Sequence, residues 1–127
     1  MNEPVIFFIE EDDDARPLLR RSLKKLGYHV SLAVDQEDAL ERVGKGCFTA
    51  DLVLIELLGK TPEEILIVAR NICRTGNLDI PIVVMASRYG ADLEGQDVRI
   101  SEKEYITYLE TADQLPNLLA RLIRRKP

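Results

Sequence analysis

The sequence predicts an α/β domain with an open five-stranded parallel sheet and helices on both faces. Short apolar runs rich in β-branched residues recur along the chain, as expected for parallel strands that are buried on both sides. Segments with apolar residues at helical spacing lie between them, so strands and helices alternate in the manner of right-handed crossovers. The expected strands are residues 5–9, 28–34, 52–55, 82–85 and 105–109.

The first two helices have clear start and stop signals. Asp13 or Asp14 is expected to cap the first helix, and Gly27 to end it. Its apolar face would consist of Leu19, Leu23 and Leu26, and its solvent-facing side of Arg20, Arg21, Lys24 and Lys25. Asp35 should open the second helix, which glycines at 44 and 46 would end.

The third helix has the strongest start signal in the chain. Residues 61–64, Thr-Pro-Glu-Glu, form a capping box with proline at the first helical position, and Gly76 should end this helix. A final helix is expected to start near Asp113. Residues 88–104 contain two glycines and no sustained helical pattern, so any helix there should be short, irregular or mobile.

Composition limits the classes of function. The 127 residues fit one domain, 1–127, and 31% charged residues with no apolar run of membrane-spanning length indicate a soluble protein with the cytoplasm as its expected location. The net charge of −5 disfavours nucleic-acid binding by this domain. Cys47 and Cys73 lie far apart without metal-site spacing, so both are expected to be reduced and structural.

One late segment departs from the acidic balance and carries Arg121, Arg124, Arg125 and Lys126. Cations at a helix C-terminus complement its dipole, which is the simpler explanation. The alternative is a junction toward an output domain or a partner.

Acidic residues follow the first and third strands, and this arrangement resembles the receiver domain of response regulators across nearly the whole chain. The resemblance implies a flavodoxin-like, receiver-like three-layer sandwich. Family members place two acids after strand one, a phosphoaccepting Asp after strand three, Thr or Ser after strand four, and Lys-Pro after strand five. The flanking segments Asp51-Leu52-Val53-Leu54-Ile55 and Pro81-Ile82-Val83-Val84-Met85 match the family pattern.

Residue by residue, the resemblance implies a degenerate switch. The acidic pocket falls on Glu10, Glu11 and Asp12, and the phosphoacceptor position on Glu56 instead of Asp. The remaining switch positions fall on Ala86, on Thr111 and on Tyr108, which keeps the family's aromatic. Ser87 is displaced by one residue, and in a strand one residue means the opposite face.

These departures are typical of pseudo-receivers, and they imply regulation by binding, with no enzymatic activity. We expect a phosphorylation-independent interaction module that binds a signalling protein or a second copy through its last strand and helices. Tyr105 and Tyr108 were expected to point the same way, into the core or onto this surface. The alternatives are a receiver of a two-component phosphorelay that is still phosphorylated, and a small-ligand sensor at the acidic cleft at the strand ends.

The crowding of acids has its own consequences. Without a cation at Thr111, a bound cation, a nearby arginine or a shared proton should relieve the repulsion among Glu10, Glu11 and Glu56. We expect no cofactor, and Mg²⁺ binding at these three acids should be weak or absent, since Mg²⁺ demands near-ideal octahedral geometry and the longer side chains disturb it. The simpler alternative is that they are solvated acids at strand ends.

Overall fold

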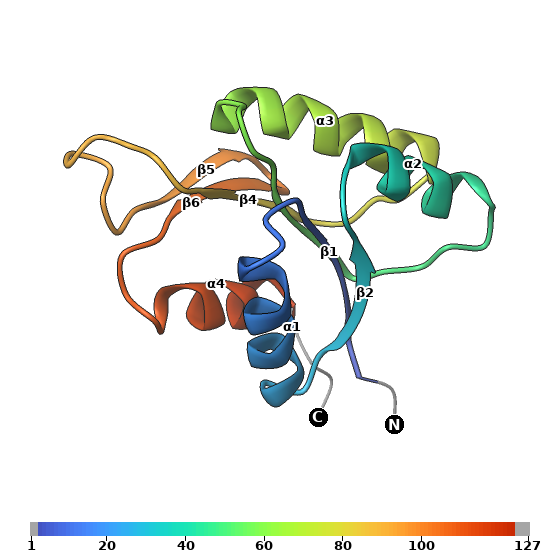
Figure 1. Ribbon diagram of the computed structural model, residues 1–127, viewed down its shortest axis with the longest axis horizontal. Helices are drawn as coiled ribbons and strands as arrows, with labels where there is room; N and C mark the ends of the chain where they lie inside the picture. The colour runs from blue at the N-terminus through green and yellow to red at the C-terminus, as the bar shows by residue number, and fades with distance from the viewer. Residues whose placement is uncertain (1–2, 124–127) are drawn as a thin grey trace.

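The computed structural model of the protein describes residues 3–123, and these form a three-layer α/β sandwich (Figure 1). The strands are β1 (Val5–Glu10), β2 (His29–Ala33), β3 (Leu52–Glu56), β4 (Ile82–Ala86), β5 (Asp97–Ser101) and β6 (Glu104–Tyr108). The helices are α1 (Ala15–Lys25), α2 (Gln36–Gly44), α3 (Pro62–Thr75) and α4 (Gln114–Leu122). The predicted alternation is therefore confirmed up to β4.

The sheet has six strands in the order β2-β1-β3-β4-β6-β5, so the expectation of five parallel strands is wrong in one respect. Five strands are parallel, and β5 adds an antiparallel edge to β6. Within residues 88–104, where a short or irregular helix was expected, the chain instead forms a loop and then a hairpin. Asp97, Val98, Arg99 and Ile100 alternate between polar and apolar residues, which is the period of a strand and not of a helix.

A glycine bulge starts this edge strand. Gly95, with φ of +79°, donates its N–H to the Tyr108 carbonyl, and the Tyr108 N–H donates to the carbonyl of Gln96. Two residues therefore oppose one, with glycine in the left-handed position that such a bulge needs. The paired residues then run from Asp97 opposite Thr107 to Ser101 opposite Glu104, with a register shift between Arg99 and Ser101.

The sheet separates two apolar layers, and the helices cover them in pairs. Phe7, Ile9 and Val53 face α2 and α3, whereas Ile6 and Phe8 face α1 and α4. All five are fully buried, and each such side chain contributes about 1.5–3 kcal/mol relative to exposure. Strands buried on both faces explain why the sequence shows continuous apolar runs instead of alternation.

The helix starts agree with the predictions for α2 and α3. Asp35 caps α2 by accepting from the N–H of Asp38, and Thr61 with Glu64 completes the capping box of α3. The N-cap of α4 is Asp113, as expected. For α1 the N-cap residue is Asp14, one of the two expected, but its side chain makes no cap hydrogen bond.

Candidate functional site

The two acids that the sequence aligns with the switch lie side by side at the carboxyl end of the sheet. In the β1–β3 register, Glu10 is directly opposite Glu56, each the last residue of its strand. Glu10 is fully buried, with 0% of its surface exposed, and Glu56 is half-buried. Neighbouring parallel strands thus bring two carboxyl groups together at the edge where open α/β sheets hold their sites.

Burial and the neighbouring acid keep Glu10 protonated. Desolvation, followed by the hydrogen bond with Glu56 and the charge of Glu56, raises the pKa of Glu10 to about 8. The Asp12 N–H, 3.3 Å from Glu10 Oε2, opposes this shift only partly. Within residues 3–123, Glu10 Oε1 is buried and has no hydrogen-bond partner, so a negative charge on this carboxyl group would be poorly stabilised. A shared proton therefore relieves the repulsion, one of the three compensations expected.

The other two acids of the predicted pocket serve different contacts. Glu11 Oε1 accepts from the N–H of Leu58 at 2.7 Å and so ties the end of β1 to the β3–α3 loop. Asp12 Oδ1 accepts from the N–H groups of Asp14 at 2.9 Å and Ala15 at 3.2 Å. Asp12 is thus the acid that satisfies the first N–H groups of α1, in place of Asp13 or Asp14. The predicted acidic pocket is split between a buried pair and two backbone contacts.

Arg16, which was not among the predicted site residues, contacts the backbone at the end of β1. Its Nε donates to the Glu10 carbonyl at 2.8 Å and its Nη2 to the Glu11 carbonyl at 3.4 Å. The same Nη2 lies 2.7 Å from Asp13 Oδ1. The guanidinium is therefore occupied by backbone carbonyls and Asp13. Its signal in the sequence was a cation in the first turn of α1, next to the acidic run.

In the structure, position 86 has no hydroxyl group at the end of β4, and position 111 has no cation. Ala86 is buried at the end of β4, and Ser87 beside it is exposed. Thr111 is exposed, and its Oγ1 donates to Asp113 Oδ1 at 2.7 Å, in the turn before α4. The groups that shift the pKa of Glu10 include two acids and a backbone N–H, and no cation is among them.

Tyr108, the switch aromatic, is held inside the protein. Only 6% of its surface is exposed, and its ring forms a T-shaped pair with the ring of Tyr89, with centroids 5.4 Å apart. The Tyr89 hydroxyl donates to the Leu109 carbonyl, which fixes the β4–β5 loop against β6. The expectation that Tyr105 and Tyr108 share a face is wrong: Tyr105 packs on the α1–α4 layer and Tyr108 on the α2–α3 layer. Residues three apart on a strand point to opposite sides.

A polar cluster around Asp97 joins the edge hairpin to α4. Asp97 Oδ1 accepts hydrogen bonds from Thr107 Oγ1 at 2.7 Å and from Gln114 Nε2 at 2.9 Å. Asp97 Oδ2 lies 3.0 Å from Arg121 Nη2. Arg121 thus has a structural partner, whereas Arg124, Arg125 and Lys126 of the same predicted cluster lie outside the described residues. Since β6 lies between β4 and β5, the surface on this side consists of β5 and α4, not of the last strand.

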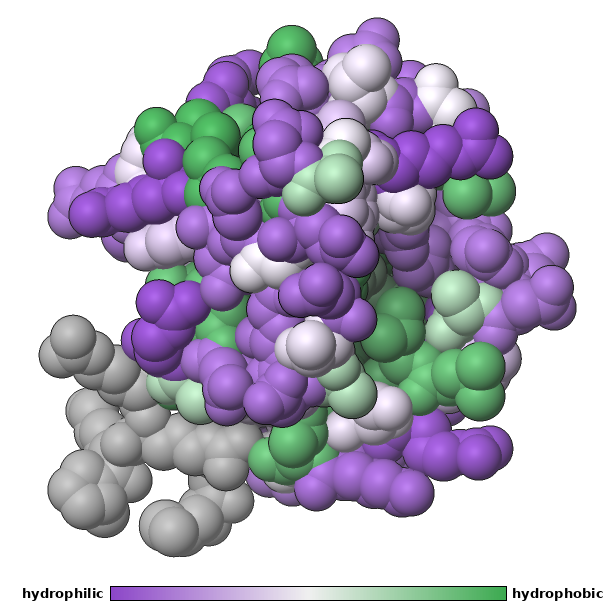
Figure 2. All heavy atoms as spheres, turned by 90° about the vertical axis from the view of Figure 1, so that its left-hand side faces the viewer, coloured by the Kyte–Doolittle hydropathy of each residue, from purple (hydrophilic) through white to green (hydrophobic). Residues whose placement is uncertain are grey.

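The surface at this side of the molecule is predominantly polar. Viewed from the side of the β4–β5 loop, it is mostly hydrophilic, with hydrophobic residues gathered in separate patches (Figure 2). On β5 the exposed apolar residue is Ile100, with 44% of its surface accessible.

The two cysteines differ in burial. Cys47 is exposed and Cys73 is buried, and both are free, so only Cys73 has the position that a packing role requires.

Among the described residues, the acids at the strand ends form no cluster of the kind that holds a metal ion. Nowhere in residues 3–123 do three or more Asp, Glu, His or Cys side chains gather in an arrangement that could hold a metal ion. Glu11 is turned to the Leu58 N–H, and Glu10 is neutral at pH 7 because burial and Glu56 raise its pKa to about 8. A hard cation such as Mg²⁺ needs several oxygen ligands around it.

Comparison with known proteins gives a consistent result for the fold. No family model and no curated protein matches the sequence. The response regulator TrrA from Thermotoga maritima, solved with Mg²⁺-BeF, is 25% identical, with a TM-score of 0.66 over 94% of this chain and 99% of that chain. TrrA also appears in a complex with the histidine kinase ThkA, a match with 21% identity and a TM-score of 0.68 over 94% and 98%.

A further response regulator from Thermotoga maritima is 20% identical, with a TM-score of 0.69 over 98% of this chain and 100% of that chain. Among residues 3–123, no helix is long and apolar enough to cross a membrane. The strand order of the five parallel strands, the two helical layers and these matches agree: the chain has the receiver fold and is similar in structure to response regulators.

Proposed function

We propose that this domain is a receiver of two-component signalling that binds a protein partner without being switched by phosphorylation, and that it has no enzymatic activity. The observation that carries the proposal is the pair Glu10–Glu56 at the strand ends. In a phosphoryl-transfer site, a carboxylate attacks phosphorus while metal ions and a cation neutralise the transferring oxygens. In this protein Glu10 is neutral at pH 7 and shares a hydrogen bond with Glu56.

The geometry of the acceptor position also argues against phosphorylation. A glutamate at position 56 places its oxygen one methylene further out than aspartate would, and a misplacement of about 1 Å can cost about a hundredfold in rate. The Glu56 carboxylate also accepts the hydrogen bond of Glu10 and is thereby engaged. Attack on a phosphodonor would first require this bond to break.

The residues that would respond to a phosphoryl group are also held in place. Tyr108 is buried against Tyr89, and Tyr89 is tied to the Leu109 carbonyl. A ligand shifts an equilibrium between two conformations only through contacts that differ between them. Ala86 and Thr111 offer neither a hydroxyl nor a charge in the right place to read a phosphoryl group. The inward Tyr108 is therefore the constitutive state in this proposal.

We place the partner surface on β5 and α4. The Asp97 cluster joins these two elements through Thr107, Gln114 and Arg121, so the surface is rigid before binding. Preorganisation of this kind lowers the entropic cost of association. That TrrA forms a complex with a histidine kinase supports a protein, rather than a nucleic acid or a small molecule, as the ligand.

The test is treatment with acetyl phosphate and Mg²⁺, followed by intact-mass measurement, with a receiver that retains the aspartate treated in parallel. We expect that control to gain one phosphoryl group and this protein to remain unmodified. A stable gain that maps to Glu56, Asp12 or Asp13 would favour the phosphorelay alternative. A thermal-shift screen with metals and metabolites addresses the alternative of a small-ligand sensor.

A further inference from the structure

The sheet ends at β5, and the outer edge of this strand is open. In the described part of the chain, β5 is the last strand in the order of the sheet and pairs with β6 alone. The backbone N–H and C=O groups on its other side therefore have no neighbouring strand. An open edge of this kind is a place where a further strand can add to a sheet.

The hydrogen-bond pattern identifies the backbone groups that face outward. In an antiparallel pair, residues that exchange hydrogen bonds alternate with residues that do not. Gln96 accepts from the Tyr108 N–H, so Val98 is the next residue of β5 that bonds to β6. Asp97 and Arg99 lie on either side of Val98 and direct their N–H and C=O groups away from β6. Each of the two thus presents a donor and an acceptor to solvent.

Irregularities at both ends keep this edge short. The glycine bulge at Gly95 precedes it, and the pairing with β6 shifts in register between Arg99 and Ser101. A strand that adds here can therefore pair in regular geometry only with residues 97–99, which are called the β5 edge below. Short, bulged edges resist continued addition of strands, so a closed pair of two edges is favoured over a growing sheet.

A second copy of the β5 edge fits the first in antiparallel orientation. When Val98 of both copies lies on the two-fold axis, Asp97 of each copy is opposite Arg99 of the other. Both residues direct their backbone groups outward, so each such pair can exchange its N–H···O bonds. Directly opposite side chains lie on the same face of a sheet, and here they carry opposite charges. One register therefore satisfies the backbone groups and the charges together.

The neighbouring symmetric registers lack this agreement. An axis at Arg99 places two arginines opposite each other and pairs Asp97 with Ser101, whose backbone faces β6. An axis at Asp97 places two aspartates opposite each other and pairs Arg99 with Gly95, whose N–H already bonds to β6. Like charges directly opposite each other destabilise a strand pair. The sequence of the β5 edge thus favours the axis at Val98.

The side chains of the β5 edge are placed for this contact. Asp97 is fixed by the polar cluster described above, and a carboxylate has about four acceptor positions, so it can accept a further donor. Arg99 is exposed, and its Nε donates to the carbonyl of Ser101 at 3.1 Å. Exchange of this acceptor for a carboxylate gives a stronger, charge-assisted hydrogen bond. On the other face, Val98 of the two copies forms a β-branched cross-strand pair.

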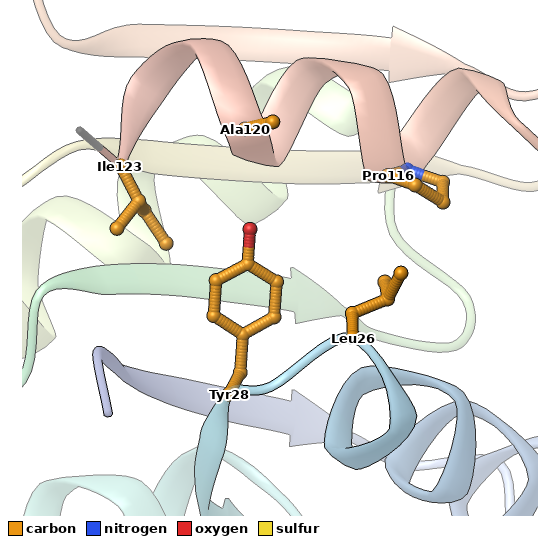
Figure 3. Close-up of a pocket in the computed structure, with 5 residues that line it drawn as sticks. All are labelled: Leu26, Tyr28, Pro116, Ala120 and Ile123. Carbon is orange, nitrogen blue, oxygen red and sulfur yellow. The ribbon is translucent and has the colours of Figure 1, made fainter. Parts of the chain in front are cut away.

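An apolar cavity between the end of α1 and α4 does not specify an occupant in this way. Its volume is about 350 Å³, and the residues that line it are Leu26, Tyr28, Pro116, Ala120 and Ile123 (Figure 3). None of these residues carries a charge, so the lining offers no pattern that would select one kind of partner. The β5 edge differs, because the direction of its backbone groups and the order of its charges both select a complementary strand.

We propose that the β5 edge is a self-association site, through which two copies of this domain pair antiparallel and join their sheets into one. The inference rests on the proposed function, which assigns β5 to the partner surface, and it names a second copy as the partner. Because the paired segment is short, the dimer is expected to be weak and transient, as is typical of interfaces below about 1,200 Å².

The first test measures the affinity by analytical ultracentrifugation of the wild type from about 10 μM to about 1 mM, the range of weak association. The variant Arg99→Glu places a glutamate opposite Asp97 at both ends of the pair. Arg20→Glu on α1 is the matched control: Arg20 is also exposed and, among the described residues, forms no ion pair, and the change in net charge is the same. Circular dichroism checks that both variants fold.

We expect Arg99→Glu to weaken the dimer at least about tenfold and Arg20→Glu less than about threefold, because charges in contact outweigh screened long-range charge. Amide shifts that depend on protein concentration should centre on Asp97 and Arg99. Both results come from the unmodified protein, without a phosphodonor.

The second test examines the register by disulfide cross-linking. The background variant Cys47→Ser removes the exposed thiol. Val98→Cys then places two thiols across the axis in a non-hydrogen-bonded pair, whose Cα atoms lie about 4.5 Å apart, within the range of a disulfide. Ile100→Cys is the control, since in this register its two copies are separated by more than about 13 Å. We expect a disulfide-linked dimer from Val98→Cys and none from Ile100→Cys.

Three results would overturn the proposal. They are a wild type that stays monomeric up to about 1 mM, an equal loss of affinity in the two charge variants, and cross-linking at position 100 that is as fast as at position 98. Each would remove the β5 dimer without bearing on whether Glu56 is phosphorylated. The acetyl phosphate experiment decides that question separately, so failure of the dimer and failure of the proposed function can be told apart.

Discussion

Glu10 and Glu56 end adjacent parallel strands in direct register, and the buried Glu10 carries the proton of the pair. Protonation of Glu10 removes its negative charge from this pair of carboxyl groups. The proton on Glu10 thus neutralises a charge that a cation would otherwise have to balance.

Stability should fall as the pH rises from about 4.5 to about 8, the unfolded and folded pKa values of Glu10. Between them the native state holds a proton that the unfolded state has released, so the slope is at most about 1.4 kcal/mol per pH unit. Glu10→Gln keeps a hydrogen-bond donor for Glu56 without titrating, so it should flatten this slope and raise the Tm above wild type at pH 8. Thermal unfolding at several pH values measures both.

Glu11→Gln is the control for that experiment. Its oxygen can still accept from the Leu58 N–H, and it is not part of the proton-sharing pair, so the wild-type pH dependence should persist. The same slope in wild type and Glu10→Gln would show that Glu10 is not the titrating group.

Glu56→Asp alone should not restore a switch. The shorter acceptor is only one of the required groups, and Ala86 and Thr111 still offer no contact that distinguishes two states. The triple variant with Ala86→Thr and Thr111→Lys should be needed before a phosphoryl group changes partner affinity. Binding measured with and without beryllofluoride compares the two. Equal responses of single and triple variants would disprove this requirement.

Asp97→Ala should destabilise the protein by about 2–4 kcal/mol. It leaves the buried Thr107 hydroxyl without its acceptor, removes the 2.9 Å hydrogen bond from Gln114 Nε2 and removes the ion pair with Arg121. Asp79→Ala is the matched control, because Asp79 forms an ion pair with Lys103 at an exposed position, worth about 0–1 kcal/mol. Urea unfolding gives both values. A similar loss in the two variants would remove the central role assigned to Asp97.

Gly95→Ala should cost about 1–2 kcal/mol, because a left-handed backbone at φ of +79° disfavours a Cβ and the new atom would lie 2.8 Å from Glu110 Oε1. Gly44→Ala, in a helix with open space around the added Cβ, should instead stabilise by about 0.5–1 kcal/mol. Chemical denaturation of both variants provides the comparison. A stabilising effect at Gly95 would contradict the bulge as the start of β5.

Much of the fold was predictable because its signals are local. The continuous apolar runs of β1, β3 and β4 and the capping box at Thr61 depend on residues adjacent in sequence. The edge strand β5 was missed, since its five residues alternate, lie between irregular segments, and owe their place to pairing with β6. Its local signals in the sequence were this short alternation and Gly95.

The site was predictable only in part, for a similar reason. Strand ends placed Glu10 and Glu56 correctly, because the register of parallel neighbours follows from the apolar pattern. No local pattern shows that Glu11 turns to Leu58 or that Arg16 binds the Glu10 and Glu11 carbonyls. The Asp97 cluster unites residues 10, 17 and 24 positions away in the chain, which only the folded sheet brings together.

The most direct test of the account is the backbone amide spectrum of the wild-type protein before and after addition of beryllofluoride with Mg²⁺. The account predicts that shifts are absent or confined to residues beside Glu56, with Tyr108, Tyr89 and α4 unchanged. Shifts that extend from Glu56 through Ala86 to Tyr108 and α4 would show a working two-state switch and would contradict phosphorylation-independent binding.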